Sequence, residues 1–301
     1  MGVTQKLGDR TWLRRLGWAT LVANMGIVLT GGAVRLTGSG LGCPTWPRCH
    51  GSSFTPHGAL DAHSAIEFGN RTLTFVLTAI AIATFVSAWR SGRADLRRLA
   101  LWLGLSVPAQ AVLGGVTVLT DLNPWVVAFH LLFSMAIISL AVLYLWQVDA
   151  GPASEGRAPA SVTQPRTLAT LAWSTYAAGW LVLALGTVVT GSGPHAGDAT
   201  APRNGLDPLQ LSQAHADAVF LFVGLSLGLL LALHGFGAPV AVVRAAAVLV
   251  AVELGQGLIG FVQYFTDLPI VLVEFHLLGA TLVAATLTWV LLQVRAAAFP
   301  R

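Results

Sequence analysis

The sequence predicts an all-α polytopic membrane protein, with eight transmembrane helices arranged as two pseudo-symmetric four-helix bundles. Three observations predict this fold class. Of the 301 residues, 55% are hydrophobic and only 10% are charged, whereas soluble proteins carry about a quarter charged residues. Several apolar stretches reach the roughly 20 residues that are needed to cross a bilayer. A segment of the first half also recurs in the second half, 146 residues later.

The eight predicted spans follow one another along the whole chain, and glycine and proline inside them are normal for membrane helices. They cover about 16–37, 64–88, 98–118, 124–147, 167–190, 211–233, 241–263 and 269–294. After the fourth span, residues 148–166 form a linker rich in Pro, Gly, Ala and Ser, which we expect to be flexible and cytoplasmic. This linker separates an N-terminal bundle, residues 1–147, from a C-terminal bundle, residues 167–301.

The basic residues lie at alternate helix ends and not on one face, so the net charge of +4 does not indicate nucleic-acid binding. Of the 17 basic residues, only four fall on one side of the predicted membrane: Arg35, Arg48, Arg71 and Arg203. The positive-inside rule therefore places both termini in the cytoplasm. The first apolar run lacks a small-residue cleavage site, so we expect a retained helix. The preference for arginine over lysine suggests a GC-rich bacterial genome, and we therefore expect a multi-pass protein of a bacterial plasma membrane.

The repeated segment keeps a histidine inside an apolar run. Residues 110–131 and 256–277 align without a gap, and 10 of their 22 positions are identical. Each copy contains Thr-Asp-Leu, an apolar run and Phe-His, where the histidines are His130 and His276. A second match joins residues 26–31 with residues 186–191. Because each half holds four spans, the halves share one orientation and are related by an axis along the membrane normal.

Three of the eight histidines lie within apolar sequence near outer helix ends: His130, His215 and His276. An ionisable residue at such a depth indicates a functional site, although packing alone is the alternative. Two imidazoles on facing helices are typical of a bis-histidine haem site. No Cys or Met stands at a suitable spacing to complete a zinc or copper site. We therefore expect His215 and His276 to hold a haem in the C-terminal half.

The first half lacks the matching pair. His215 precedes His276 by 61 residues, but the residue 60 positions before His130 is Asn70, a poor haem ligand. His63 lies two turns earlier on the same helix face, about 10 Å away, and is the alternative partner. This asymmetry predicts a permanent redox cofactor in one half and a bound, reacting substrate in the other.

Glu67 lies on one helix face with Asn70 and Arg71. It either forms an ion pair with Arg71, or it acts as the catalytic carboxylate by carrying a proton or stabilising a cation beside the open site. Cys43 and Cys49 are the only cysteines, and they fall on the outer side, where disulfides persist. We expect them to form a disulfide, either structural or redox-responsive.

Together these residues resemble the haem A synthase family over nearly all eight spans. The resemblance rests on residues 31–41 (GGAVRLTGSGL), on residues 43–49 (CPTWPRC), on Ile66-Glu67-Phe68 and on the embedded histidines. It implies that the protein oxidises the C8 methyl group of haem O to a formyl group, giving haem A for cytochrome c oxidase. It also implies haem b on His215 and His276, and haem O as substrate near Glu67 and His130. Asn70 departs from the family pattern, in which many members have a histidine after the glutamate.

The implied partners are the lipid bilayer, haem O and an unidentified electron donor, with haem O synthase and cytochrome c oxidase assembly factors as further candidates. Two other functions are compatible with the pattern. A non-enzymatic b-type cytochrome that exchanges electrons with quinone predicts two equivalent sites. A transporter built from repeats predicts broken helices and a polar pathway at the midplane.

Overall fold

The computed structural model describes residues 8–56, 62–151 and 162–299. These residues form eight α-helices and no β-strand: α2 (Arg10–Leu36), α3 (Ala62–Arg90), α4 (Ala94–Leu119), α5 (Pro124–Ala150), α6 (Pro165–Ser192), α7 (Pro208–Gly235), α8 (Val240–Phe265) and α9 (Ile270–Ala298). All eight are long and apolar enough to cross a membrane, which confirms the predicted fold class. Most of the predicted linker, residues 152–161, lies outside the described residues.

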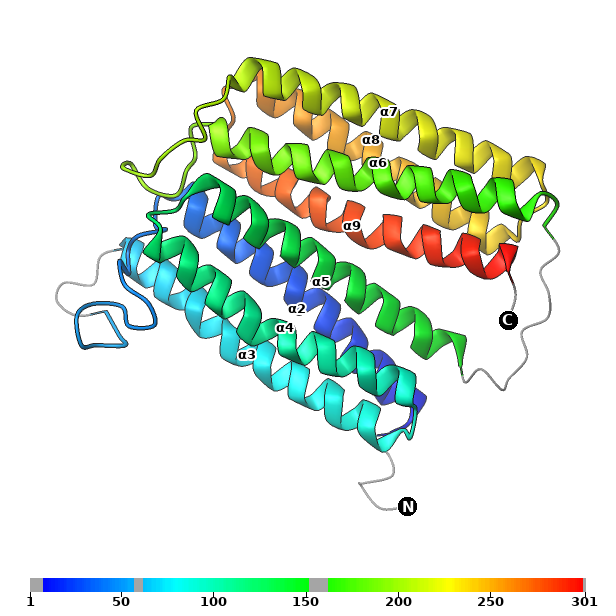
Figure 1. Ribbon diagram of the computed structural model, residues 1–301, viewed down its shortest axis with the longest axis horizontal. Helices are drawn as coiled ribbons and strands as arrows, with labels where there is room; N and C mark the ends of the chain where they lie inside the picture. Colours follow the sequence, from blue (N-terminus) through cyan, green and yellow to red (C-terminus); the bar gives the residue numbers. More distant parts are fainter. Residues whose placement is uncertain (1–7, 57–61, 152–161, 300–301) are drawn as a thin grey trace.

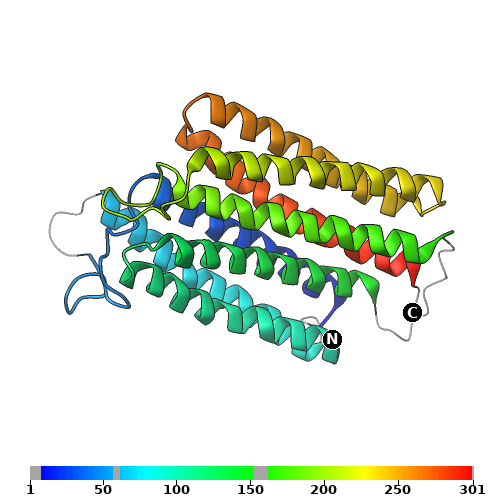
Figure 2. The same cartoon turned by 45° about the horizontal axis from the view of Figure 1, so that its top comes forward.

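The helices lie side by side in two groups of four (Figure 1). In the first group α2 contacts α3 and α5, and α4 contacts the same two helices; α6, α7, α8 and α9 contact one another in the same order. The groups meet along α2, α5, α6 and α9. In both views the start of α2 and the end of α9 lie at the same end of the molecule (Figures 1 and 2). The internal pseudo-symmetry stays a prediction, with which this order of contacts agrees.

Close packing at small residues holds the helices together. Lipid is as apolar as a leucine side chain, so helix association in a membrane depends on van der Waals contact and hydrogen bonds. At Gly179 of α6, an added Cβ would collide with Leu287 of α9 and would lie 3.0 Å from the ring of Phe222 of α7. Between the two groups, the Thr288 hydroxyl of α9 donates to the Ser139 hydroxyl of α5 at 3.0 Å in a buried position.

The two Thr-Asp-Leu segments adopt the same backbone conformation. Asp121 and Leu122 have φ angles of 52° and 59°, and Asp267 and Leu268 have φ angles of 58° and 55°. Such values are uncommon for residues other than glycine. In each copy the leucine N–H closes the turn on a carbonyl five residues earlier, at 2.8 Å in both cases. The sequence repeat is therefore also a repeat of local structure, and it joins α4 to α5 and α8 to α9.

The loops at the end of the molecule opposite the start of α2 and the end of α9 link the two groups, and we call this end the outer end. Arg35, at the end of α2, donates from Nε to the His195 carbonyl at 2.5 Å and from Nη2 to the Thr190 carbonyl at 2.8 Å. The Gly40 N–H donates to the Gly197 carbonyl at 2.8 Å. These bonds join the glycine-rich segment after α2 to the loop after α6, so the outer loops cap both bundles as one unit.

Replacing Gly179 by alanine should destabilise the protein. The new methyl group overlaps Leu287 and crowds Phe222, and overpacking of this kind costs about 1–3 kcal/mol. Gly228→Ala is the matched control, because within the described residues nothing lies within 4 Å of a Cβ at that helical position. Thermal unfolding of the detergent-purified variants, followed by loss of the monodisperse peak, measures the difference. Equal midpoints for the two variants would contradict the packing described for α6.

Candidate functional site

Each of the three membrane-embedded histidines lies with its ring against a glycine of the neighbouring helix. An added Cβ would stand at contact distance from ring Cε1 in every case: Gly114 with His130 at 3.5 Å, Gly186 with His215 at 3.2 Å, and Gly260 with His276 at 3.2 Å. We call these three pairs the histidine cradles. The glycine in each cradle provides the space that the imidazole occupies.

The helix starts place the three rings at a common depth, in the second helical turn from the outer end. α5 and α7 begin with a proline, which suits a first helical position. The preceding residue caps each helix: Asn123 accepts from the Trp125 N–H at 3.0 Å, and Asp207 accepts from the Leu209 N–H at 2.8 Å. These caps satisfy backbone donors that lack a partner inside the helix. They also fix how far each histidine lies from the outer end.

In each cradle, one nitrogen of the histidine ring lacks a hydrogen-bond partner among the described residues. In the described part of the chain, Nδ1 of His130, His215 and His276 is buried and makes no hydrogen bond. The carbonyl of Val182 lies near the His215 ring, and the carbonyl of Gln256 lies near the His276 ring. Each carbonyl stands four residues before the glycine of its cradle. A small ring rotation would satisfy Nδ1 there, as is usual for a histidine that coordinates a metal through its other nitrogen.

His215 of α7 and His276 of α9 lie in the same group of helices, and their role as a ligand pair stays a prediction. The two rings are close enough for their charges to interact. His130 has no ionisable partner of this kind among the described residues. The C-terminal group therefore presents two imidazoles to one space between α7 and α9, whereas the N-terminal group presents one.

By analogy with the three cradles, the repeat predicts a fourth cradle between α2 and α3. This fourth position has a glycine, Gly26, but no histidine. Gly26 of α2 matches Gly186 in the repeat, yet no described atom lies within 4 Å of a Cβ built there. Asn70 of α3 stands where α7 has His215, and its Oδ1 accepts from the Thr30 hydroxyl at 2.7 Å. The short amide is thus held by α2, one turn from Gly26. His63, the alternative partner, is exposed, and its Nδ1 is hydrogen-bonded to the Ser39 hydroxyl at 3.0 Å.

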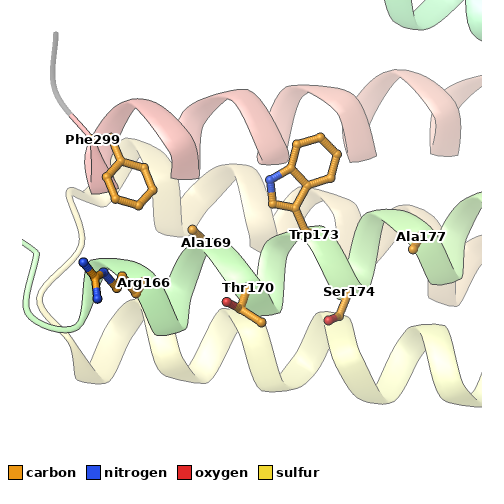
Figure 3. A pocket seen from close by; sticks show the side chains of 7 residues that line it. All are labelled: Arg166, Ala169, Thr170, Trp173, Ser174, Ala177 and Phe299. Atoms are coloured by element: carbon orange, nitrogen blue, oxygen red, sulfur yellow. The ribbon is translucent and has the colours of Figure 1, made fainter.

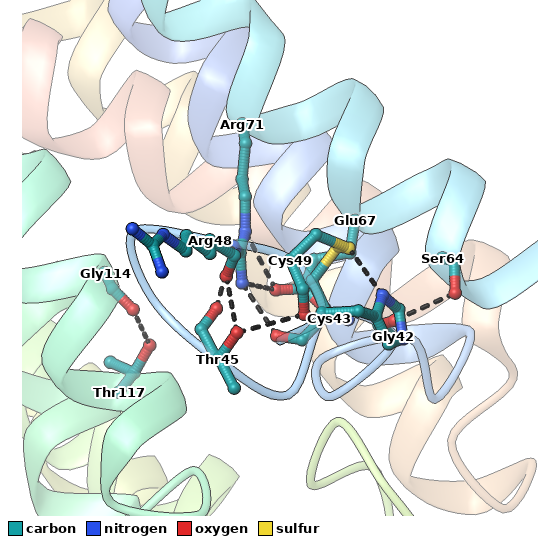
Figure 4. Close-up of polar contacts among 11 residues, drawn as sticks. Gly42, Cys43, Thr45, Arg48, Cys49, Ser64, Glu67, Arg71, Gly114 and Thr117 are labelled. Carbon is teal, nitrogen blue, oxygen red and sulfur yellow. Dashed lines mark hydrogen bonds and ion pairs between the residues drawn. A yellow bond between two sulfur atoms is a disulfide. The ribbon is translucent and has the colours of Figure 1, made fainter. Parts of the chain in front are cut away.

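Glu67 is 4% exposed and faces the loop between α2 and α3 (Figure 4). Its Oε2 accepts from the Cys43 N–H at 2.6 Å, and its Oε1 accepts from Arg71 Nε at 3.1 Å. Arg71 also donates to the carbonyls of Cys43 and Thr45, at 2.8 and 3.0 Å. The ion pair with Arg71 is therefore present, and it anchors the loop to α3.

The same loop carries the predicted disulfide between Cys43 and Cys49, which the structure contains with both residues fully buried. The disulfide loop, residues 43–49, reaches across to α4. There the ring of Trp46 lies so close to Gly115 that an added Cβ would collide with it. Gly115 is next to Gly114, the glycine of the His130 cradle. The loop thus places an aromatic ring beside the only histidine cradle of the first group.

The cradle glycines and Trp46 were missed by reasoning from the sequence. The signal was present, because Gly114 and Gly260 are identical positions of the repeat, as are Gly26 and Gly186. The Glu274 carboxylate lies 2.8 Å from a Cβ built on Gly32 of α2. It therefore faces the boundary between the two groups.

A surface hollow of about 640 Å³ lies beside the first turns of α6 (Figure 3). These turns are at the opposite end of the helices from the three histidines. The hollow is lined by Arg166, Ala169, Thr170, Trp173, Ser174, Ala177 and Phe299. None of the predicted site residues lines it. The chemistry of the chain is concentrated in the outer half of the bundles instead.

A family model described as cytochrome oxidase assembly protein matches residues 14–208, well over half of the chain. The matched region includes the disulfide loop, Glu67, Asn70 and His130. It ends before His215 and His276.

Curated relatives add two enzyme names. The "Heme A synthase" of Bacillus licheniformis is 30% identical over 149 residues, and that of Bacillus pumilus is 37% identical over 124 residues. The aligned stretches cover 48% and 40% of this chain. The "Protoheme IX farnesyltransferase" of Halobacterium salinarum is 31% identical over 126 residues, which is 41% of this chain and 28% of that protein. The aligned stretches cover 48% and 39% of the two Bacillus proteins, so the chain spans about half the length or less of these two relatives.

Replacing Arg71 by alanine should loosen the disulfide loop. It leaves the buried Glu67 carboxylate without its cation, and breaking a buried pair in this way costs about 3–5 kcal/mol. Arg48→Ala is the control, because Arg48 belongs to the same loop but its guanidinium stacks over Phe54 at the surface. Thermal unfolding, together with the rate at which a reductant opens the disulfide, measures both effects. An Arg71→Ala protein as stable as Arg48→Ala would show that the ion pair does not anchor the loop.

Proposed function

We propose a function for this chain on the premise that it belongs to the family of cytochrome oxidase assembly proteins. The function is that of a haem A synthase, a membrane oxidoreductase that converts the C8 methyl group of haem O to a formyl group. One observation carries the proposal: three histidine cradles lie at one depth, and the fourth position holds Asn70 near an uncovered glycine. The relatives named heme A synthase support the same activity.

In the C-terminal group, His215 and His276 would hold a haem b as its axial ligands. The fit is supported by the proximity of the two rings and by their buried Nδ1 atoms, which leave Nε2 as the coordinating nitrogen. Gln256 strengthens the arrangement, because its amide donates to the His276 carbonyl at 2.7 Å and so ties α8 to α9. A haem bound there supplies one-electron transfer.

In the N-terminal group, His130 would bind the iron of the substrate haem O. Asn70 is held by Thr30 and leaves the opposite side without an imidazole, which suits a molecule that must enter and leave. Trp46 belongs to the disulfide loop, and its ring packs against α4 beside the His130 cradle. It would offer an aromatic face to a porphyrin. The division into a substrate half, residues 1–147, and a cofactor half, residues 167–301, follows from this assignment.

The proposed reaction oxidises the C8 methyl carbon of haem O. Successive hydroxylations give a geminal diol, which loses water to form the aldehyde. If the inserted oxygen comes from water, each hydroxylation releases two electrons and two protons to an acceptor. If it comes from dioxygen, each hydroxylation takes two electrons and two protons from the donor side, and the second oxygen atom leaves as water. Glu67 is our candidate catalytic carboxylate, at the outer end of the substrate half. Its bonds to Arg71 and to the Cys43 N–H support a first role in holding the disulfide loop over the site.

The surroundings of the enzyme follow from its substrate. Haem O is a lipid-soluble porphyrin, so we place the protein in the bacterial plasma membrane, with both termini cytoplasmic as the charge pattern predicts. The similarity to a protein named protoheme IX farnesyltransferase supports a working contact with the enzyme that makes haem O. Cytochrome c oxidase assembly factors are the further candidate partners.

The alternative is a b-type cytochrome that only carries electrons to or from quinone. Such a carrier predicts two equivalent haem sites. The two groups are unequal, because one has Asn70 bound to Thr30 and an uncovered Gly26 and the other has a histidine pair, and this inequality favours the enzyme.

Removing either ligand of the histidine pair should abolish the haem b spectrum. We expect His215→Ala and His276→Ala to lower the haem b content of the purified protein by at least about tenfold, equivalent to 1.4 kcal/mol or more of binding. His234→Ala, at the far end of α7, is the matched control and should retain the pigment. Pyridine haemochrome analysis and reduced-minus-oxidised spectra measure the content. Retention of the b-type spectrum in both variants would remove these residues from the site.

Replacing Asn70 by histidine should add the missing ligand. The new ring is expected to occupy the open space over Gly26, and the haem O or haem A retained by the N-terminal group should become low-spin and at least about tenfold more tightly held. Asn70→Leu, of similar size but unable to coordinate, is the control. Electron paramagnetic resonance and retention on extraction report the change. Identical spectra for the two variants would show that residue 70 does not face the substrate iron.

A further inference from the structure

Glu253 is a buried carboxyl group that the proposed reaction does not use. It lies half-way along α8 and is 4% exposed. Its Oε1 accepts from the Ser226 hydroxyl of α7 at 2.7 Å. Its Oε2 is buried and has no hydrogen-bond partner among the described residues. An ionised carboxylate at this depth is expensive, and intramembrane acids of this kind commonly mark proton pathways.

The neighbouring helices provide no cation for this acid. α8 packs against α7 and α9. From α7, only the uncharged Ser226 reaches Glu253, and the described residues exert no charge interaction on it. The ionisable groups of α9 lie towards its two ends: Glu274, His276 and Arg295. Among the described residues, no charged side chain therefore offsets a negative charge on Glu253.

The duplicate half shows that packing does not require the acid. Asn70 of α3 and His215 of α7, like the last residues of these two helices, are 145 residues apart, and both bounds of α4 and α8 are 146 residues apart. At these offsets Ser226 matches Ala81 and Glu253 matches Val107, and both of these apolar residues are buried. The same place in the fold is thus filled by two apolar side chains in one half and by a hydrogen-bonded acid in the other.

Glu253 lies on the same face of α8 as the His276 cradle, with the polar side chain of Gln256 between them. Glu253, Gln256 and Gly260 stand at i, i+3 and i+7, which places them on one face of α8. Gln256 donates to the His276 carbonyl at 2.7 Å, and its own Oε1 is buried without a described partner. The His276 ring packs against Gly260. The acid therefore lies about 10 Å along the helix from that ring, at 1.5 Å per residue.

We propose that Glu253 is the proton-exchanging group of the C-terminal half, and that it takes up a proton when an electron reaches the haem held by His215 and His276. This inference rests on the proposed function. A haem held there would supply the one-electron redox change, with the electron coming from a one-electron donor, and a proton from bulk water would form the O–H bond at Oε2 of Glu253. When the electron leaves, Glu253 releases the proton. The physical cause is electrostatic: the ferric site carries a positive charge that favours the carboxylate, and reduction removes it in a medium that screens charge weakly.

Redox-difference infrared spectroscopy of the purified haem-containing protein tests this directly. In the wild type, reduction should produce a carbonyl band of a protonated carboxylic acid, and the midpoint potential of the haem should fall as pH rises. Glu253→Gln should lose the band and flatten the dependence on pH, with the haem spectrum retained. Ser226→Ala should keep the band and move it to higher frequency, because the hydrogen bond to Oε1 is gone.

The duplicate half supplies the control for folding. The double variant Glu253→Val with Ser226→Ala reproduces the pair Val107 and Ala81, so it should fold, hold haem and show no band. A band that persists in Glu253→Gln, or a wild type that contains reducible haem but shows no band, would overturn the role of Glu253 alone. Wild-type protein that holds no haem at all would overturn the proposed function together with this inference.

Discussion

The structure depends on how an imidazole is accommodated between helices inside a membrane. A polar ring in hydrocarbon needs room, and its nitrogens need partners. The chain meets the first need with glycine, because Gly114, Gly186 and Gly260 each leave the space of a side chain under a histidine. It meets the second need only in part, since the ring Nδ1 atoms are left without hydrogen bonds. These unpaired nitrogens are the reason why we propose the three places as binding sites.

Duplication explains both the common frame and the differences between the halves. The Thr-Asp-Leu turns share the same left-handed backbone, and the helices after them carry a histidine at the same depth. On this common frame the polar residues have diverged. The first half has the Glu67–Arg71 ion pair and Asn70, whereas the second half has His215 and the Glu253–Ser226 pair. A frame that is stable with either set leaves each half free to take a separate role.

The loops at the outer end place an aromatic side chain beside one cradle and link the two groups of helices. The disulfide loop is fastened to α3 by Arg71 and Glu67 and delivers Trp46 to α4, next to the His130 cradle. Arg35 then links the end of α2 to the loop after α6 through two backbone carbonyls. Because these contacts cross from one group to the other, the cap over the first site is connected to the cap over the second.

The sequence by itself determined the eight spans, the repeat, the disulfide and the inequality between His215 and Asn70. These follow from hydropathy, from spacing and from residue type, which are local properties of the chain. Only the tertiary structure decided which glycine lies under each histidine, that Glu67 is bound to Arg71 and the disulfide loop, that Glu274 faces α2, and that Glu253 meets Ser226. Such contacts depend on the rotation of one helix against another. That rotation is set by the close approach of side chains distant in sequence, which a single helix pattern does not record.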